Sequence, residues 1–140
     1  MKLTSQSEYA LLALVCIARE TESAVISAEK ISKLQSIPLK FLEQILIALR
    51  RAGFVKSTKG MRGGYRLAKR AGEISLAEVI RLFEGALAPT TSASTYFYES
   101  TPIEKEQKIL NVFCEIRDFV AKKLETTSLA DVADMKGANA

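Results

Sequence analysis

The chain has 140 residues, of which 48% are hydrophobic and 26% are charged, the composition of an ordinary soluble globular protein. It contains no histidine and only two cysteines, Cys16 and Cys114, which excludes histidine-dependent catalysis, most zinc sites and a disulfide framework. The N-terminus does not resemble a signal peptide, and the longest apolar run is shorter than the roughly 20 residues of a membrane span. We therefore expect a cytoplasmic protein with no membrane partner.

The net charge of +4 is unevenly distributed along the chain. Residues 40–70 contain nine basic side chains and one acidic side chain, Glu43, whereas residues 1–39 carry no net charge and residues 71–140 are acidic. A basic block of this kind is typical of a surface that binds the phosphate backbone of nucleic acid. A solvated basic surface without such a partner is the alternative.

The first predicted helix is capped by Thr4 or Ser5 and ends near Arg19. Its middle is apolar nearly all round, so we expect it to be the central helix of the core. Cys16 lies in this apolar part and is expected to be a small buried hydrophobic side chain, with a redox-active thiol as the alternative.

The next two predicted helices are separated by only two residues. Ser27 is the expected N-cap of a helix over residues 28–35, in which Ile31 and Leu34 face inward. Pro38 suits the first turn of the following helix, and Gly53 suits the position just beyond its end. Two helices joined by so short a turn predict a helix-turn-helix, whose second helix presents its N-terminal residues to the DNA major groove.

The third predicted helix has an apolar stripe and a polar outer face. The stripe recurs at helical spacing and comprises Leu39, Leu42, Leu46 and Leu49. The residues that point away from it are Lys40, Glu43, Gln44, Ile47 and Arg51.

These outer residues have side chains that can read bases. Lys40 can reach a phosphate or guanine, and Gln44 can pair with adenine. Glu43 can accept a hydrogen bond from cytosine, or it can order Lys40 or Gln44 instead. Phe41 either touches a thymine methyl group or packs on the first helix. With Pro38 and Arg51, these residues form the candidate major-groove set.

Two short strands, residues 54–58 and 65–67, flank a loop too rich in glycine to be helical. A cationic hairpin directly after a helix-turn-helix is the wing of a winged helix, which lies on phosphates or enters the minor groove. The loop matches no nucleotide-binding motif. The candidate contact residues of the wing are Lys59, Gly60, Arg62, Gly63 and Tyr65.

A fourth helix, capped by the box Ser75 to Glu78 and ended by Gly85, precedes a Thr/Ser/Ala/Pro-rich loop. Tyr96-Phe97-Tyr98 in this loop either pack on the body or a partner subunit, or contact a small ligand or partner protein. A second capping box, Thr101 to Glu104 with proline at N1, predicts a long helix that runs to about Leu124.

The long helix carries two neighbouring apolar stripes, which is more than one small domain can cover from one side. The excess predicts a homodimer whose partner helix covers one stripe. Cys114 lies on this helix, where an intersubunit disulfide is an alternative to a free thiol. The expected dimerisation residues are Ile109, Val112, Phe113, Ile116, Phe119 and Val120.

The fold class that follows is mainly α with a small β-hairpin wing. Residues 1–85 form a winged helix-turn-helix DNA-binding domain, residues 86–102 a linker loop and residues 103–125 a dimerisation helix. Residues 126–140 form a short helix, capped by Ser128 and running from Leu129 to Met135, and a tail.

The run FLEQ…LRRAGFV…KGMRGGY, with MKLTSQSEYALLAL before it and ISLAEVIRLFEG and FCEIRDFVAKKLETTSLADV after it, resembles a known family. This is the family of bacterial winged-helix transcriptional regulators that includes IscR, NsrR and CymR. The resemblance implies a homodimeric transcription factor that binds an imperfect palindrome in double-stranded DNA. A repressor is the leading hypothesis, and the absence of histidine, of paired acids in the candidate site and of a cofactor motif argues against an enzyme. It places Lys40, Phe41, Glu43 and Gln44 in the major groove, and Lys59, Gly60 and Arg62 on the wing.

The chain departs from the cluster-binding members of that family in one loop. Those members carry three cysteines between the fourth helix and the dimerisation helix, whereas residues 86–100 contain none here. We therefore expect no iron–sulfur cluster, no other cofactor and no metal, since such clusters need several thiolates. A partner protein or a small metabolite would then supply the regulatory signal. A winged helix that binds a protein instead of DNA is the alternative function.

Overall fold

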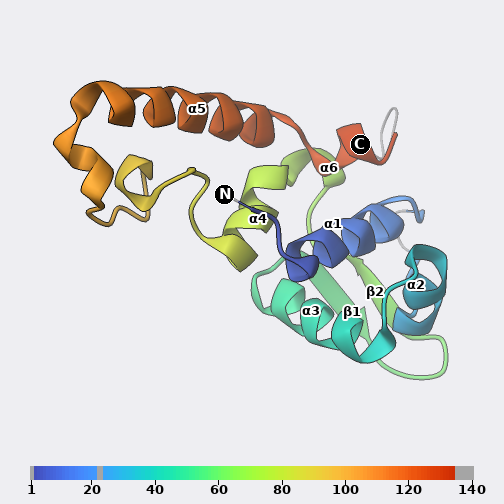
Figure 1. Ribbon diagram of the computed structural model, residues 1–140. Helices are drawn as coiled ribbons and strands as arrows, with labels where there is room; N and C mark the ends of the chain where they lie inside the picture. The colour runs from blue at the N-terminus through green and yellow to red at the C-terminus, as the bar shows by residue number, and fades with distance from the viewer. Residues whose placement is uncertain (1, 22–23, 135–140) are drawn as a thin grey trace.

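The computed structural model describes residues 2–21 and 24–134, which form a mainly helical fold with one two-stranded antiparallel sheet (Figure 1). Short 3₁₀ turns occupy Ala71–Glu73, Thr91–Ala93 and Pro102–Lys105. None of the helices in the described ranges is long and apolar enough to cross a membrane. The helices and strands are α1 (Ser5–Ala18), α2 (Ala28–Gln35), α3 (Leu39–Arg51), β1 (Val55–Thr58), β2 (Gly64–Leu67), α4 (Leu76–Glu84), α5 (Gln107–Thr126) and α6 (Leu129–Val132).

Helix α1 is the centre of the fold, as its apolar sequence predicted. It begins after the N-cap Thr4, and it packs against α2, α3, α4, α6 and β2. Ala10, Ala13 and Leu14 are completely buried, while Leu12 is exposed. The main hydrophobic core therefore forms around α1, and a smaller cluster of Ala77, Ile80 and Leu87 adjoins it.

The helix-turn-helix forms, and α2 spans the predicted residues, but two details of the prediction are wrong. Leu34 is 60% exposed, whereas Ile31 is completely buried and Gln35, one turn further on, is half-buried. Leu34 precedes Gln35 by one residue, or about 100° of helix rotation, and so points away from that side. Pro38 is the N-cap and not part of the first turn. Its ψ is 127°, and its carbonyl accepts the first helical hydrogen bond from the Leu42 N–H at 2.9 Å.

The long helix begins later than its sequence predicted. Residues Pro102–Lys105 form a 3₁₀ turn, and α5 starts at Gln107. The capping box at Thr101 does not form, because Thr101 Oγ1 lies 2.6 Å from Ser92 Oγ. The Glu104 carboxylate accepts hydrogen bonds from Ser100 Oγ and from the Tyr98 hydroxyl instead.

After α5 the chain returns to the core. The Leu76 N–H donates to the Thr127 carbonyl at 3.0 Å, and the Leu129 N–H donates to the Ile74 carbonyl at 2.8 Å. The predicted cap at Ser128 forms, and Leu129 is completely buried in the core around α1. Helix α6 ends at Val132; the predicted end at Met135 and the tail lie outside the described residues.

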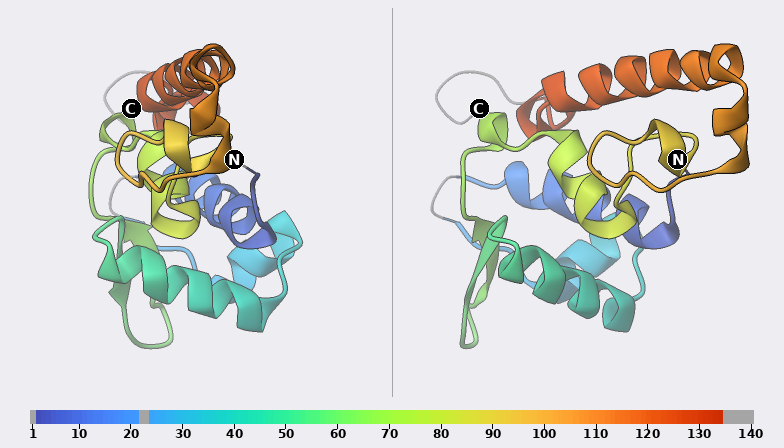
Figure 2. Two further views of the ribbon diagram at one scale, coloured as in Figure 1. Left: turned by 60° about the vertical axis from the view of Figure 1, so that its left-hand side comes forward. Right: turned by 90° about the vertical axis from the view of Figure 1, so that its left-hand side faces the viewer.

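The elements are arranged so that α5 and α3 lie on opposite sides of the molecule. Figures 1 and 2 show α5 along one edge, and α3 with the hairpin along the other, with α1 and α4 between them. A surface on α3 and the hairpin therefore stays clear of any partner that covers α5.

Candidate nucleic-acid interface

The turn between α2 and α3 sets the direction in which α3 leaves the core. Ser36 adopts a left-handed conformation with φ 54°, which reverses the chain after α2. The Ile37 N–H donates to the Ser32 carbonyl at 3.0 Å, the Ser32 hydroxyl donates back to the Ile37 carbonyl, and the Ile37 side chain is buried. The short turn is therefore held by hydrogen bonds and by an apolar anchor.

Helix α3 buries one face and exposes the other. Leu42, Ile45, Leu46 and Leu49 are completely buried, whereas Leu39 is half-buried. Ile45, which the predicted stripe omitted, is therefore part of the buried face. Ile47 is half-buried at the edge of the outer face. The exposed candidate contact residues at α3 are Pro38, Lys40, Phe41, Glu43, Gln44 and Arg51.

Phe41 combines the two roles that its sequence position left open. Its ring meets the ring of Tyr9 in α1 edge to face, with centroids 5.6 Å apart and an interplanar angle of 78°. The Phe41 side chain nevertheless remains 46% exposed. Packing on α1 thus holds the ring in place and leaves part of it available to a ligand.

Glu43 stands free on the outer face of α3. Within residues 2–21 and 24–134, it forms no hydrogen bond or ion pair with Lys40 or Gln44. Neither contact is present in the described chain without DNA, and both interpretations of Glu43 stay predictions.

The hairpin forms with a tight, exposed tip. The register pairs Val55 with Leu67 and Thr58 with Gly64. Across the tip, the Gly63 N–H donates to the Gly60 carbonyl at 3.0 Å, and Gly60 has φ 107°. A Cβ atom on Gly63 would overlap the Thr58 carbonyl. The exposed residues of the tip are Lys59, Gly60, Met61 and Arg62.

The base of the hairpin is fixed to the helix-turn-helix by a contact that the sequence analysis missed. The Ile26 N–H donates to the Tyr65 carbonyl at 3.0 Å, and the Tyr65 N–H donates to the Ile26 carbonyl at 2.8 Å. Gly64 permits this approach, since a Cβ there would overlap the Ile26 carbonyl. Tyr65 is half-buried against the core. No local pattern marks residue 26 as a strand, because it contributes a single bridge.

The basic block lies largely on the surface of these elements. Lys40, Lys59 and Arg62 form no ion pair with another described residue, whereas Arg81 and Arg117 each form one, with Glu125 and Asp118. The charges of Lys40, Lys59 and Arg62 are therefore available to an anionic ligand. Helix α3 and the hairpin, which carry them, lie on the same side of the molecule (Figure 2).

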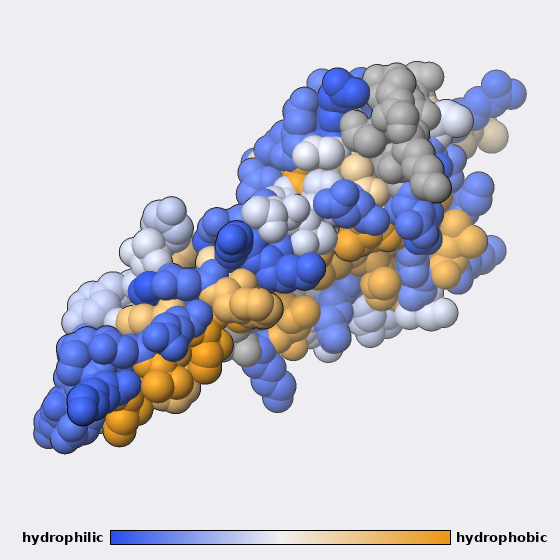
Figure 3. All heavy atoms as spheres, turned by 90° about the horizontal axis from the view of Figure 1, so that it is seen from above, coloured by the Kyte–Doolittle hydropathy of each residue, from blue (hydrophilic) through white to orange (hydrophobic). Residues whose placement is uncertain are grey.

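The second candidate surface is the outer face of α5, which has no buried residue along its length. Of the six expected dimerisation residues, Phe113 and Val120 are half-buried. They belong to the apolar stripe of α5 that faces the body of the molecule. The other four are exposed, Phe119 at 74%. Figure 3, which looks onto the α5 side, shows apolar atoms in a strip along this part of the molecule. The exposed four are Ile109, Val112, Ile116 and Phe119.

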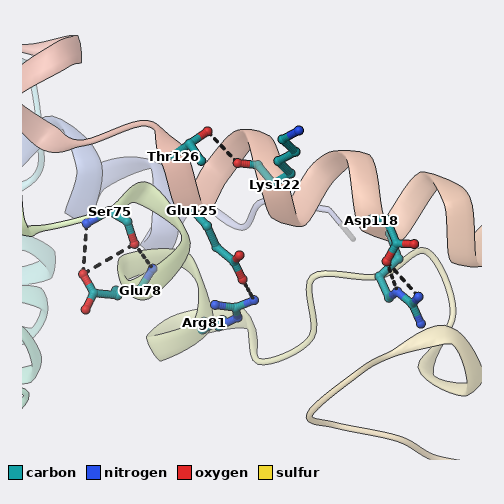
Figure 4. A network of polar contacts seen from close by, with 8 residues as sticks. Ser75, Glu78, Arg81, Asp118, Lys122, Glu125 and Thr126 are labelled. Atoms are coloured by element: carbon teal, nitrogen blue, oxygen red, sulfur yellow. Dashed lines mark hydrogen bonds and ion pairs between the residues drawn. The ribbon is translucent and has the colours of Figure 1, made fainter.

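The loop between α4 and α5 lies beside both helices. Arg81 of α4 forms an ion pair with Glu125 of α5 at 2.6 Å (Figure 4), and its guanidinium lies 5.2 Å from the ring centroid of Tyr96. Tyr96, Phe97 and Tyr98 are all exposed. The aromatic triplet is thus only partly packed on the body, and both of its predicted roles stay open.

Comparisons with known proteins agree with this architecture. A family model described as Rrf2, "Iron-dependent Transcriptional regulator", matches residues 3–135. Protein rrf2 of Nitratidesulfovibrio vulgaris is 32% identical over 135 residues, which cover 94% of this chain and 87% of that protein. The structure of CymR, the global cysteine regulator of B. subtilis, is similar with a TM-score of 0.76 and 28% identity over 98% of this chain and 99% of that one. The structure of T. potens IscR is similar with a TM-score of 0.73 and 25% identity, over 96% and 87% of the two chains.

The family description names iron, but the residues of this chain do not fit an iron centre. Cys16 is buried in the core, where burial, with the charge of Glu20, raises the pKa of its thiol above the ordinary value of 9.0. Cys114 lies on α5, half-buried. The described part of the chain contains no group of three or more Cys, His, Asp or Glu side chains placed to hold a metal ion. An iron–sulfur cluster needs several thiolates, and two separate cysteines do not supply them.

Proposed function

The chain belongs to the Rrf2 family of transcriptional regulators, and we propose that it is a homodimeric repressor that binds an imperfect palindrome in double-stranded DNA. The predicted resemblance to IscR and CymR and the predicted winged-helix fold are confirmed. The protein is a DNA-binding regulator of transcription, and its family is not one of enzymes. The dimer, the repression, the palindrome and the residue roles below are proposals.

The observation that carries the proposal is that α3 and the wing lie on the same side of the molecule. Helix α3 and the hairpin lie on one side of the molecule, opposite α5 (Figure 1), and Lys59 and Arg62 are exposed at the hairpin tip. A duplex on that side can receive α3 in its major groove while the wing follows the adjacent backbone. The residues proposed to contact DNA, all from residues 1–85, are Pro38, Lys40, Phe41, Glu43, Gln44, Arg51, Lys59, Gly60, Arg62, Gly63 and Tyr65.

These residues divide by chemistry. Gln44 is proposed to pair with adenine and Glu43 with cytosine, while Lys40 contacts guanine or a phosphate. Lys59 and Arg62 neutralise phosphates or enter the minor groove. Gly60 and Gly63 permit a tip narrow enough for close approach, and Tyr65 holds the base of the wing.

Dimerisation through α5 would present two winged-helix domains, one from each subunit, to the DNA. In a two-fold dimer the same apolar face of each helix meets its copy, and two-fold symmetry in the protein requires a palindrome in the DNA. The exposed apolar face of α5, in the proposed dimerisation segment 103–125, supports this assembly. Repression then requires only that the dimer occupies a promoter, in the cytoplasm where a bacterial chromosome lies.

The regulatory signal is proposed to be a partner protein or a small metabolite, because the cysteines do not fit a cluster. The loop at residues 86–102 connects the DNA-binding domain to the dimerisation helix, so a signal bound there would change the relation between the two. Its exposed aromatic triplet offers apolar surface for such a contact.

The test is a salt titration of binding to a DNA fragment that carries a sequence selected by the protein from a random pool. The logarithm of the binding constant should fall linearly with the logarithm of salt concentration, and Lys59→Ala or Arg62→Ala should each reduce the slope by about one. Gln44→Ala should relax the preference at one base pair and cost about 1–3 kcal/mol there. Lys122→Ala, on the exposed polar side of α5, is the matched control and should leave the slope unchanged.

Binding that depends on neither salt nor sequence would contradict DNA recognition by this surface and favour a protein-binding winged helix. A promoter whose transcription rises when the regulator occupies it would contradict repression.

A further inference from the structure

Among residues 2–21 and 24–134, the large apolar side chain of Met61 is in full contact with solvent. Met61 is the most exposed of the large hydrophobic residues in the described part of the chain, and it belongs to neither hydrophobic cluster. Its neighbours Lys59 and Arg62 are exposed cations. The side chain therefore adds nothing to the packing of the folded protein, and its position is explained better by a ligand that the tip contacts.

The hairpin tip places Met61 at its apex. The hydrogen bond from the Gly63 N–H to the Gly60 carbonyl closes a four-residue turn whose two central residues are Met61 and Arg62. The two glycines keep the flanks of this turn free of side chains, and a Cβ on Gly63 would overlap the backbone of Thr58. Met61 and Arg62 therefore occupy the two central positions of the exposed tip.

On the basis of the proposed function, we propose that Met61 enters the DNA minor groove beside Arg62 and selects A·T-rich segments by shape. The minor groove of B-DNA is about 6 Å wide, and its walls are the apolar C–H groups of the sugars. An unbranched, flexible thioether can follow such a slot, and methionine is among the apolar residues that minor-groove proteins insert.

The chemistry of the groove floor makes the contact selective. A G·C pair places the guanine N2 amino group in the minor groove, whereas an A·T pair presents only acceptors there and leaves more room. The amino group would obstruct the methionine sterically, whereas the floor of an A·T pair leaves room for it. Arg62 adds the attraction of a cation to the narrow A·T-rich groove, but the steric discrimination belongs to Met61.

The experiment uses inosine to separate the two grooves. An I·C pair has the minor-groove floor of A·T and the major-groove edge of G·C. Hydroxyl-radical footprinting first identifies the base pairs under the wing. These are the pairs whose sugars are protected by the full-length protein but not by the Arg62→Ala variant. Operators carrying A·T, I·C or G·C at these pairs are then compared by equilibrium binding to wild-type protein and to Met61→Ala.

We expect the wild type to bind the A·T and I·C operators roughly three- to tenfold more tightly than the G·C operator, from the apolar area at stake. Met61→Ala should bind all three with nearly equal affinity and keep the wild-type salt slope, whereas Arg62→Ala should lower the slope. Met61→Leu, which retains an apolar side chain of similar volume, should keep most of the preference. Because Met61 packs against nothing, thermal unfolding of Met61→Ala should match that of the wild type.

The outcomes separate this inference from the function on which it rests. If Arg62→Ala weakens binding but Met61→Ala changes neither the affinity nor the preference, the role of Met61 is refuted and the DNA-binding proposal stands. An equal loss on all three operators would also refute selection by the groove floor. If neither variant affects binding or its salt dependence, the wing does not contact DNA and the proposed function itself fails in this part.

Discussion

At the scale of single residues, Glu84 shows how one carboxylate can join two helices. It lies at the end of α4 and accepts hydrogen bonds at the start of α1, from the hydroxyl of Ser7 and from the backbone N–H and hydroxyl of Thr4, the latter two at 2.7 Å. These bonds, that of Ser7 foremost, hold the pKa of Glu84 below its ordinary value of 4.5. A negative charge at a helix N-terminus is also favoured by the helix dipole.

The lowered pKa predicts a pH-dependent contribution to stability. Because the folded state favours the charged form, the contribution is fully present above pH 4.5 and is lost as the pH falls through the folded-state pKa. Glu84→Gln should therefore lower the free energy of unfolding at neutral pH, and the difference from wild type should narrow in acid. Denaturant titrations at both pH values and one protein concentration measure this.

Glu99→Gln is the control, since Glu99 is an exposed carboxylate in the neighbouring loop. It should change stability little at either pH. A Glu84→Gln effect of the same size at neutral and acidic pH would show that the carboxylate charge does not stabilise the junction.

At the scale of elements, α6 is small but structurally important. It has only four residues, yet Leu129 is completely buried in the core around α1. The bridge between Ser75 and Ser128 brings it there, and both serines also cap helices, α4 and α6. The C-terminal end of α5 is therefore attached to the body by backbone hydrogen bonds and by an apolar side chain.

Leu129→Ala should lower the free energy of unfolding by about 2–5 kcal/mol, because it removes a buried side chain and leaves a cavity. Val132→Ala on the same helix is the matched control, since Val132 is exposed and its loss should cost no more than about 0.5 kcal/mol. Chemical denaturation of both variants makes the comparison. Equal losses would show that α6 does not dock in the core.

At the scale of the whole molecule, charge and apolar surface are separated. The basic block lies on α3 and the wing, and the exposed apolar face lies on α5 at the opposite edge (Figure 1). Helix α4 lies between these two surfaces and is attached to α5 by the Arg81–Glu125 ion pair. Leu124 of α5 also packs on the smaller hydrophobic cluster. One surface can thus bind DNA while the other binds a second copy of the chain.

Phe119→Lys should therefore convert the proposed dimer into a folded monomer, because Phe119 is exposed and its replacement leaves no cavity. Sedimentation should show the change in mass. The affinity for a full palindrome should fall by roughly 100-fold or more, toward the affinity for a half-site, because the two winged-helix domains no longer bind as a linked pair.

Affinity for an isolated half-site should stay close to that of the wild type, which separates loss of the dimer from loss of the reading surface. Lys122→Ala, one turn along on the exposed polar side of α5, should leave both the mass and the affinities unchanged. A Phe119→Lys protein that remains dimeric would place the interface elsewhere.

The sequence by itself was enough for the parts of the molecule that local physics decides. The limits of α2 and the capping box of α4 follow from side chains within a few residues of each helix start. The hairpin follows from glycine in a short loop between β-prone residues, and the basic block is visible in the order of the residues. Even the two stripes of α5 are a local pattern.

The folded structure decided what depends on contacts outside a single helix or strand. Ser92, Ser100 and Tyr98 take the hydrogen-bonding groups of Thr101 and Glu104, so α5 starts later than its local signal predicted. Ile26 holds the wing through a single bridge that carries no periodicity, and Leu129 joins a core formed largely by earlier residues. Which stripe of α5 faces solvent was also settled only by packing, since both stripes are apolar and only the folded body selects the one that it covers.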